Sequence, residues 1–355
     1  MYKKIIFLVI IFCLGLGFGI FIFGNKGFND YETIDITKTN YLGSTHEGNF
    51  VWGGAMNLAW NEMSENIIKE KEIRMATQDP IALYMIKSFN TQFFNKNNLD
   101  SKSYYIKSGF GQNTVDLINK ESKQKFPEKT FKDLKIELQK EDFIVYSYFL
   151  KEVEYPDQFK ERTVSFLENK VKGFYAGSDQ YKNVLVYDYI NDDKFTIKLA
   201  LKDEEDELFI LKGYQDKIPE KLVDHINKLK NSSDNPRSIN NVDSFEMPKI
   251  SFEFRRDYEE LIDKFFLNEG FENHYISEMF ENIKFKLDHK GARVENEAVI
   301  VGMFATAGPG SREPKPRHFI LDKPFWIVMK RQDSQIPYFI LGINNTEMMD
   351  KTFGL

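Results

Sequence analysis

The sequence predicts an α+β fold, and three observations lead to that class. Helical spacing of apolar residues is concentrated between residues 50 and 126, in the first part of the chain. Runs of apolar, aromatic and β-branched residues, which are typical of strands, dominate from residue 143 onward. The two kinds of segment do not alternate as regular β-α-β units, so the pattern favours segregated helices and strands.

Three helices are expected in the first part of the chain. Residues 50–68 carry small and apolar residues on one helical face. Residues 80–93 begin with a proline, which is well tolerated in the first turn of a helix. The third helix is expected to start near Asn113 or Thr114, because either residue is a suitable N-cap.

The strongest strand signal is the run FIVYSYFL at residues 143–150. Its continuous apolar and aromatic character predicts a central strand that is buried on both faces. Residues 184–189 and 195–201 flank the Asn-Asp-Asp turn at residues 191–193, so these two runs are expected to form a hairpin.

The rest of the chain continues this mixed pattern, without an internal repeat or a low-complexity tract. Residues 218–230 predict an amphipathic helix, and residues 231–243 form a polar loop rich in Asn and Ser. The remaining expectations are a helix at residues 258–266 and strands at residues 208–211, 250–254, 283–287, 325–330 and 338–343.

Composition excludes several classes of function. The formal net charge of −6 and the pI near 5.6 argue against a basic surface for nucleic acid. The five histidines form no HExxH motif and there is no CxxC, so no metal or other cofactor is expected. The only cysteine, Cys13, excludes an internal disulfide and cysteine catalysis in the folded domain. An enzyme is not favoured, because neither a Gly-x-Ser-x-Gly motif nor a Walker loop is present.

The N-terminus predicts attachment to a membrane. Residues 5–23 are nearly all apolar and follow Lys3 and Lys4, a pattern typical of a single span. The lysines favour a cytoplasmic N-terminus with the main domain on the extracytoplasmic side. A cleaved signal peptide, which would give a secreted protein, is the alternative. We therefore expect residues 1–24 to be a transmembrane anchor or uncleaved signal, residues 25–48 a linker, and residues 49–355 the folded domain.

Several sequence blocks resemble the serpins, a family of protease inhibitors that act through an insertable loop. YISEMFENIKFKLDHKG at residues 275–291 resembles the serpin hinge strand, and KPFWIVMKR and PYFILGINN resemble the two closing strands. EMPKISFEFRRDYEELIDKFF resembles the Pro-Lys strand and the helix after it, TVDLINKESKQKF resembles the Ile-Asn helix, and DFIVYSYFLKEV lies where a central strand is usual. The resemblance implies a large mixed or antiparallel sheet surrounded by helices, and a second, C-terminal sheet.

The chain also departs from the serpin pattern. His289 stands where the family has an acidic residue, two positions before the hinge glycine. The tryptophan expected at the end of the central strand is absent, and residues 152–155 stand there instead. The chain between Met85 and Ile106 is much shorter than in the family. These departures indicate a divergent, shortened relative, and the Lys, Asn, Ile and Phe richness suggests a bacterial one.

The resemblance places the reactive loop at about residues 291–318, beginning at the hinge Gly291. A loop that inserts into a sheet must turn alternate side chains toward the core. One set of alternate residues is uncharged, whereas Arg293, Glu295 and Glu297 all fall in the other set. The hinge and insertion residues are therefore expected to be Gly291, Ala292, Val294, Asn296, Ala298 and Ile300. The same alternation is also typical of an ordinary solvated strand edge.

The position of the cleaved bond follows from the spacing of the family. About fourteen residues past Gly291, the spacing points to the bond between Ala305 and Thr306, which suits a protease with a small specificity pocket. Arg312-Glu313 is the alternative for a trypsin-like protease, although it lies farther along the loop. Residues 308–318 are rich in Pro and Gly and are not expected to join a sheet.

Two functions follow from the resemblance. The first is a membrane-tethered, monomeric inhibitor that presents its loop to a serine or cysteine protease and traps the protease by loop insertion. The second is a non-inhibitory serpin-fold protein that binds a partner or acts as a scaffold at the cell surface. A rise in thermal stability after loop cleavage would distinguish the first from the second.

Overall fold

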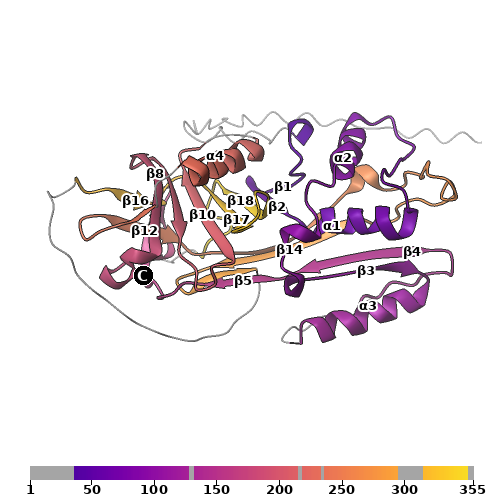
Figure 1. The fold of residues 1–355 in the computed structure, drawn as a ribbon, viewed down its shortest axis with the longest axis horizontal. Helices are drawn as coiled ribbons and strands as arrows, with labels where there is room; N and C mark the ends of the chain where they lie inside the picture. The colour runs from indigo at the N-terminus through magenta and orange to yellow at the C-terminus, as the bar shows by residue number, and fades with distance from the viewer. Residues whose placement is uncertain (1–35, 128–131, 215–217, 233–235, 295–314, 351–355) are drawn as a thin grey trace, which may run out of the picture. The chain divides into compact units, whose positions relative to one another are not determined.

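The computed structural model describes residues 36–127, 132–214, 218–232, 236–294 and 315–350 (Figure 1). The chain divides into residues 1–30 and 31–355, and all described residues belong to the second unit. Within the described residues no helix is long and apolar enough to cross a membrane. The span expected at residues 5–23 lies outside them. Residues 39–48, expected to be part of a linker, belong to the folded unit, since Thr39, Tyr41 and Leu42 are buried.

The largest sheet has eight antiparallel strands in the order β1-β2-β18-β17-β10-β9-β8-β11. Its inner strands β10 and β18 are buried along their whole length. Strand β18 carries no charged residue, whereas β10 has an apolar run at residues 208–211 flanked by the buried charged residues Asp206, Glu207 and Lys212. The strands are β1 (Ser44–His46), β2 (Asn49–Gly53), β8 (Val184–Asn191), β9 (Lys194–Leu199), β10 (Asp206–Lys212), β11 (Arg237–Ser238), β17 (Phe325–Arg331) and β18 (Pro337–Ile343).

A second sheet of four strands has the order β16-β12-β7-β6. Its strands are β6 (Lys160–Phe166), β7 (Asn169–Tyr175), β12 (Ser244–Pro248) and β16 (His318–Ile320). The pairing of β12 with β16 is parallel, whereas the other two pairings are antiparallel. The edge strand β16 is the first strand after the expected reactive loop.

The expected hinge lies in a third sheet, of order β13-β14-β15-β5. Its strands are β5 (Lys151–Glu154), β13 (Ile250–Asp257), β14 (Phe280–Leu287) and β15 (Gly291–Val294). A separate two-stranded ribbon pairs β3 (Tyr104–Phe110) with β4 (Phe143–Phe149). Only Leu150 separates β4 from β5, so the ribbon and the third sheet are consecutive along the chain.

The helices are α1 (Ala55–Glu62), the π-helical turn η2 (Met63–Ile68), α2 (Pro80–Asn90), α3 (Gln112–Lys125) and α4 (Pro219–Ser232). The part of the chain that the structure describes also contains five short 3-10 helices: η1 (Ile36–Lys38), η3 (Lys96–Asn98), η4 (Ser101–Ser103), η5 (Ser178–Asn183) and η6 (Glu259–Leu261). Helix α2 starts with Pro80 after Asp79, whose side chain accepts a hydrogen bond from the Ile81 N–H at 2.9 Å. Figure 1 shows α1 and α3 on opposite sides of the β3-β4 ribbon.

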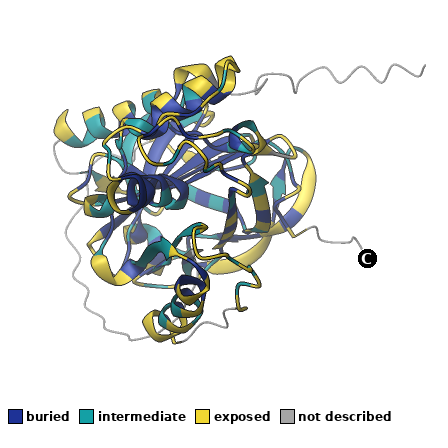
Figure 2. Ribbon diagram, turned by 90° about the vertical axis from the view of Figure 1, so that its right-hand side faces the viewer, coloured by how far each residue is buried: buried dark blue, intermediate teal, exposed yellow. Residues whose placement is uncertain are grey.

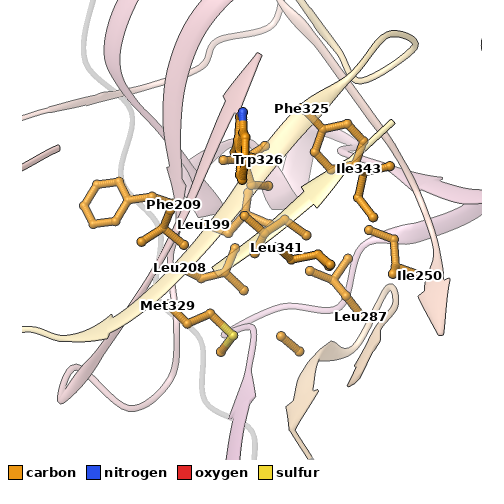
Figure 3. Close-up of a cluster of buried hydrophobic side chains, with 14 of the residues drawn as sticks. Leu199, Leu208, Phe209, Ile250, Leu287, Phe325, Trp326, Met329, Leu341 and Ile343 are labelled. Carbon is orange, nitrogen blue, oxygen red and sulfur yellow. The ribbon is translucent and has the colours of Figure 1, made fainter. Parts of the chain in front are cut away.

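The core forms where the eight-stranded sheet meets the third sheet. Figure 3 shows Ile250 and Leu287 lying against the side chains of Leu341 and Ile343. A smaller cluster, which includes Trp60, packs α1, η2 and α2 together. Buried residues fill the interior strands, whereas exposed residues lie on the outer helix faces and loops (Figure 2). Burial of this apolar surface is the main contribution that stabilises the fold.

The α+β class is confirmed, but several local expectations were wrong. Residues 50–53 belong to β2, since they pair with β18, far away in the sequence. The helix expected at residues 258–266 is only the short η6, because Asp263 adopts a left-handed conformation (φ 58°). Helix α3 starts earlier than expected, with Gly111 as its N-cap and no side-chain cap.

The central strand expected at residues 143–150 is also corrected. Strand β4 is half-exposed along its whole length, and within the described residues it pairs only with β3. The hairpin expected at residues 184–201 is confirmed, with Asn191 opposite Lys194. Strands β17 and β18 occupy the expected runs near the C-terminus.

Candidate functional site

The expected hinge is built into the third sheet. Strand β15 pairs antiparallel with β14, where Ala292 lies opposite Leu287. Its other edge pairs antiparallel with β5, where Ala292 lies opposite Val153. Ala292, Leu287 and Val153 are all buried, so the Ala292 side chain points into the core. Two-sided pairing of this short strand places the start of the expected loop between β14 and β5.

A tight turn reverses the chain from β14 into β15. The Asp288 N–H donates to the Gly291 carbonyl at 3.0 Å, and the Lys290 N–H donates to Asp288 Oδ1 at 2.8 Å. Burial acts to raise the pKa of Asp288, but the Lys290 N–H and the Lys286 ammonium outweigh it and hold the pKa below its usual value. The turn is therefore stabilised by an ionised carboxylate.

Gly291 is required at the end of this turn by close packing against β5. A Cβ atom at position 291 would lie 2.1 Å from the Val153 carbonyl oxygen and 2.9 Å from the Glu154 Cα atom. Both contacts are with backbone atoms, which cannot move aside as a side chain can. The close approach explains why a glycine stands where β14 turns into β15.

His289 lies within the same turn and is half-buried. Its Nδ1 atom is 3.3 Å from Glu161 Oε1. Burial lowers the pKa of His289, although the Glu161 carboxylate acts in the opposite direction. The His289 carbonyl accepts a hydrogen bond from the Phe159 N–H at 2.8 Å. The residue that departs from the serpin pattern is therefore integrated into the packing of the turn.

Beyond the short pairing with β15, one edge of β14 and one edge of β4 have no strand partner within the described residues. All eight residues of β14 pair with β13 on one side, but only Lys286 and Leu287 pair with β15 on the other. Strand β4 pairs with β3 on one side only. Residues 280–285 of β14 and the second edge of β4 thus have no ladder partner among the described strands, and strand edges of this kind are templates for an added strand. We call the region between these edges the slot.

The two edges of the slot are brought together by β2 and α1. A Cβ atom on Gly53 would lie 3.8 Å from Ile283 of β14 and 3.8 Å from Phe149 of β4. Helix α1, which begins two residues later, contacts both strands. The Ser147 hydroxyl of β4 donates to the Ala55 carbonyl at 2.6 Å. The glycine and the first turn of α1 therefore form the floor of the slot.

One buried carboxyl group belongs to this floor. Glu281 of β14 is 7% exposed, and its Oε2 atom accepts a hydrogen bond from the Tyr258 hydroxyl at 3.2 Å. Its Oε1 atom is buried and makes no hydrogen bond within the described residues. This residue was missed by the sequence analysis, although its place in the alternating pattern of β14 could have drawn attention to it.

The far end of the expected loop is fixed to the second sheet. Arg317 donates from Nε and Nη2 to the Asp243 carboxylate at 3.1 and 2.7 Å. Lys212 donates to the Ile320 carbonyl at 2.8 Å and to Asp322 Oδ1 at 2.6 Å. Charge-assisted bonds of this kind are stronger than neutral ones. The segment that follows the loop is therefore held at both ends of β16.

Of the other expected site residues, only Val294 lies within the described part of the chain. Val294 takes part in β15 through its backbone, opposite Lys151. Asn296, Ala298, Ile300, Ala305 and Thr306 lie outside the described residues, so the insertion row beyond β15 and the cleaved bond remain predictions. Within the described ranges, no group of three or more His, Cys, Asp or Glu side chains is arranged to hold a metal ion.

The chain was compared with known families, proteins and solved structures. No protein-family model matches the chain, and no curated protein matches it in sequence. Among solved structures, the chain matches the crystal structure of Serpin48, described as a highly specific serpin in the insect Tenebrio molitor. The two are 14% identical with a TM-score of 0.49, and the match covers 89% of this chain and 97% of Serpin48.

Proposed function

We propose that this chain is a serpin-type protease inhibitor. Its loop, at about residues 291–318, would be offered to a serine or cysteine protease and would insert into the slot after cleavage. The observation that carries the proposal is strand β15. The start of the loop already pairs with both β14 and β5, while the edges of β14 and β4 beyond it are unpaired within the described residues.

The register of β15 defines the expected inserted state. Lys286 lies opposite Arg293 and Leu287 opposite Ala292, so each step back along β14 advances the loop by one residue. Continued insertion would bring Glu295 opposite Lys284 on the solvent face. It would bring Ala298 opposite Glu281 on the core face. Opposite charges on one face and a small residue on the other both favour insertion.

The covalent step of the proposal is an interrupted proteolysis. The hydroxyl oxygen of a serine protease attacks the Ala305 carbonyl carbon, and the amide bond to Thr306 breaks, with the Thr306 amine leaving with a proton. The resulting ester links the protease to the new C-terminus at Ala305. Insertion of the freed strand would then move the attached protease and disturb the alignment of its catalytic groups, so that the ester is not hydrolysed.

The direct test is incubation with a panel of proteases that includes elastase-like and subtilisin-like enzymes. An inhibitor gives a complex that survives denaturing electrophoresis, and mass spectrometry of the released C-terminal fragment locates the cleaved bond. The cleaved chain is expected to melt at a markedly higher temperature than the intact chain. Cleavage without a complex and without a rise in melting temperature would instead support the non-inhibitory scaffold function.

A matched pair of variants tests insertion itself. Ala298→Glu places a charge in the row that must face the core, so it is expected to prevent both the stable complex and the thermal shift. Burial of an unpaired charge costs several kcal/mol. Glu297→Gln changes the neighbouring residue in the solvent-facing row and is expected to leave both unchanged. Equal behaviour of the two variants would contradict the proposed insertion.

Membrane attachment through residues 1–24 is part of the same proposal. The apolar run at residues 5–23 after two lysines supports an anchor that holds the inhibitor domain on the extracytoplasmic side. The domain would then act as a monomer at the cell surface. Cleavage of the segment would release the domain as a secreted protein. Membrane fractionation and N-terminal sequencing of the mature chain distinguish these two forms.

A further inference from the structure

Six of the seven large apolar side chains that are exposed in the described residues come from three segments that pack together. They are Phe265, Leu267 and Tyr275 from the segment between η6 and β14, Ile81 and Leu83 from the first turn of α2, and Phe110 from the end of β3. Helix α2 contacts η6, and the ring centroids of Phe110 and Phe271 are 6.5 Å apart. Figure 1 shows α2 and the orange segment after η6 at the same end of the molecule. Exposed apolar residues gathered in this way indicate an interaction surface.

Phe265 and Leu267 break a rule that the neighbouring strands obey. In β13 and β14 every exposed position carries a polar residue, such as Glu253 or Lys284. Residues 265–267 alternate in the same way, with Phe266 fully buried, but Phe265 is 49% exposed and Leu267 is 53% exposed. A single exposed apolar residue is ordinary, whereas adjoining ones on an ordered face indicate a partner.

The backbone beneath these side chains is well anchored. The Leu267 N–H donates to the Arg74 carbonyl at 2.8 Å. The fully buried Asn268 accepts a hydrogen bond from the Arg74 N–H at 2.8 Å. The Tyr275 ring lies against Phe265, with 5.4 Å between the ring centroids. Phe265, Leu267 and Tyr275, which we call the apolar patch, are therefore a preformed surface that loses little conformational entropy on binding.

The path of the chain before β1 indicates what the apolar patch faces. The Ser88 hydroxyl of α2 donates to Asn40 Oδ1 at 3.1 Å. One turn earlier in α2, the Tyr84 hydroxyl donates to the Thr39 carbonyl at 3.2 Å. The chain thus runs alongside α2 in the same direction, and η1, which also contacts α2, lies toward the first turn of that helix.

The distance in sequence from η1 to the apolar run at residues 5–23 is short. Only residues 24–35, twelve in number, lie between them. Twelve residues span at most about 40 Å, so membrane attachment through that run would keep η1 within this distance of a bilayer. Attachment at such short range raises the effective concentration of the lipid surface, so that a patch of few side chains suffices for contact.

The charges around the apolar patch indicate the kind of lipid. Residues 262–278 contain four acidic residues against a single lysine, Lys264. Glu269 and Glu272 are both exposed beside the patch. Clusters of lysine and arginine, which attract anionic lipids, are not found in this segment. Contact through phenylalanine, leucine and tyrosine is instead typical of the interfacial region of a bilayer with neutral headgroups.

We propose that the apolar patch lies in the headgroup region of a zwitterionic lipid bilayer, so that the domain has a fixed orientation on the membrane. The inference rests on the membrane attachment proposed above, but it does not depend on protease inhibition. Figure 1 shows β16, the strand that follows the expected reactive loop, at the opposite end of the molecule from α2. Docking through the patch would therefore present the loop on the side that faces away from the bilayer.

The test is the depth of a nitroxide label in the full chain, reconstituted in phosphatidylcholine vesicles. Cys13→Ser removes the only cysteine, so Leu267→Cys places one label in the patch. Ile190→Cys is the matched control, because Ile190 of β8 is a similarly exposed apolar residue (58%) outside the three segments. Power-saturation EPR compares collisions with oxygen, which enters lipid, and with a water-soluble nickel complex. We expect the label at position 267 about 5–10 Å inside the interface and the label at position 190 in water.

Two further variants separate docking from folding. Phe265→Ser combined with Tyr275→Ser should return the label at position 267 to water with little change in melting temperature, because both side chains are exposed. Phe265→Leu combined with Tyr275→Phe keeps the patch apolar and should keep the depth of the label. Addition of phosphatidylglycerol to the vesicles should not deepen the label, and a deeper label there would contradict the assigned class of lipid.

The proposal is overturned if the nickel complex reaches the labels at positions 267 and 190 equally. It is also overturned if the label at position 267 is shielded from both oxygen and nickel, since protein then covers the patch; dipolar broadening would identify a second copy of the chain. Flotation with the vesicles tests the anchor separately. A chain that floats with a water-exposed patch keeps the anchor and refutes docking, whereas a chain that does not float contradicts both. Protease trapping is unaffected by any of these results.

Discussion

Two adjacent glycines at the floor of the slot have opposite surroundings. A Cβ atom on Gly53 would make ordinary contacts of 3.4–3.8 Å with Glu281, Ile283 and Phe149. A Cβ atom on Gly54 would overlap the buried ring of Phe94, with its Cε1 atom only 2.2 Å away. Space for one methyl group therefore exists at the first position but not at the second.

The substitutions Gly53→Ala and Gly54→Ala are accordingly expected to act in opposite directions. Gly53→Ala should raise the free energy of unfolding by about 0.4–1 kcal/mol, because it reduces the freedom of the unfolded chain without a clash. Gly54→Ala should lower it by about 1–3 kcal/mol through overpacking against Phe94. Urea denaturation of the two variants beside the unchanged chain measures both. Equal destabilisation by the two would show that the floor has no room at Gly53.

At the scale of the element, the hinge strand β15 depends on one position. Gly291→Ala is expected to disrupt the pairing of β15 with β5, because the added Cβ atom meets the Val153 carbonyl oxygen. We expect a loss of about 1–3 kcal/mol in stability and faster amide exchange in β5. Lys290→Ala, at the neighbouring exposed position, should leave both nearly unchanged. A Gly291→Ala chain with unaltered exchange in β5 would contradict the role assigned to this glycine.

The anchor before β16 is expected to respond to acid. The Asp243 side chain is fully buried. Burial opposes its ionisation, but the hydrogen bonds from Arg317 outweigh burial and hold its pKa below the usual value. A lowered pKa contributes stability that is present above the unfolded-state pKa and is lost as the pH falls through the folded-state pKa. Asp243→Asn should therefore cost about 1–3 kcal/mol near neutral pH and progressively less below about pH 4.

The exposed pair of Arg331 and Asp333 is a matched control for this anchor. Arg331 also donates from Nε and Nη2 to both carboxylate oxygens, at 2.9 and 2.8 Å, but the Asp333 side chain is 68% exposed. Solvent screens such a pair, so Asp333→Asn should change the unfolding free energy by less than about 1 kcal/mol. Denaturation of both variants at neutral and acidic pH makes the comparison. Similar effects at the two sites would argue against a special anchoring role for Asp243.

Elements with a strong local signal were predicted well, and those set by distant partners were not. The β8-β9 hairpin was found because its turn residues lie between two apolar runs. Strand β2 was mistaken for helix, since its pairing with β18 connects residues almost three hundred positions apart. Residues 258–266 have helix-like apolar spacing, but Tyr258 bonds to the Met279 carbonyl and Phe266 to the His274 carbonyl. Tertiary contacts override local preference in both cases.

The candidate site was predicted in part for the same reason. Gly291 and the uncharged row that begins at Ala292 were visible in the local alternation. The floor was not, because Gly53, Phe149 and Glu281 come from three distant segments that only the fold brings together. The half-exposed character of β4 was also missed, since an apolar run does not reveal whether a neighbouring strand will cover it.

At the scale of the whole molecule, the described core lies entirely between residues 39 and 350. A chain that begins at residue 31 is therefore expected to fold and to melt at the same temperature as the full chain. The two should differ in detergent phase partitioning, because only the full chain carries the apolar run at residues 5–23. Calorimetry and Triton X-114 extraction test the two parts separately. A large drop in melting temperature for the shorter chain would show that residues 1–30 contribute to the folded unit.

Strands β17 and β18 come after the loop in sequence, yet they are among the inner strands of the eight-stranded sheet. A nick anywhere in the loop would produce two polypeptides that share one hydrophobic interior. They would remain associated through the pairing of β17 with β10 and of β18 with β2, and would comigrate on size exclusion. The C-terminal piece would separate only in denaturant, so native chromatography alone would report a severed chain as whole.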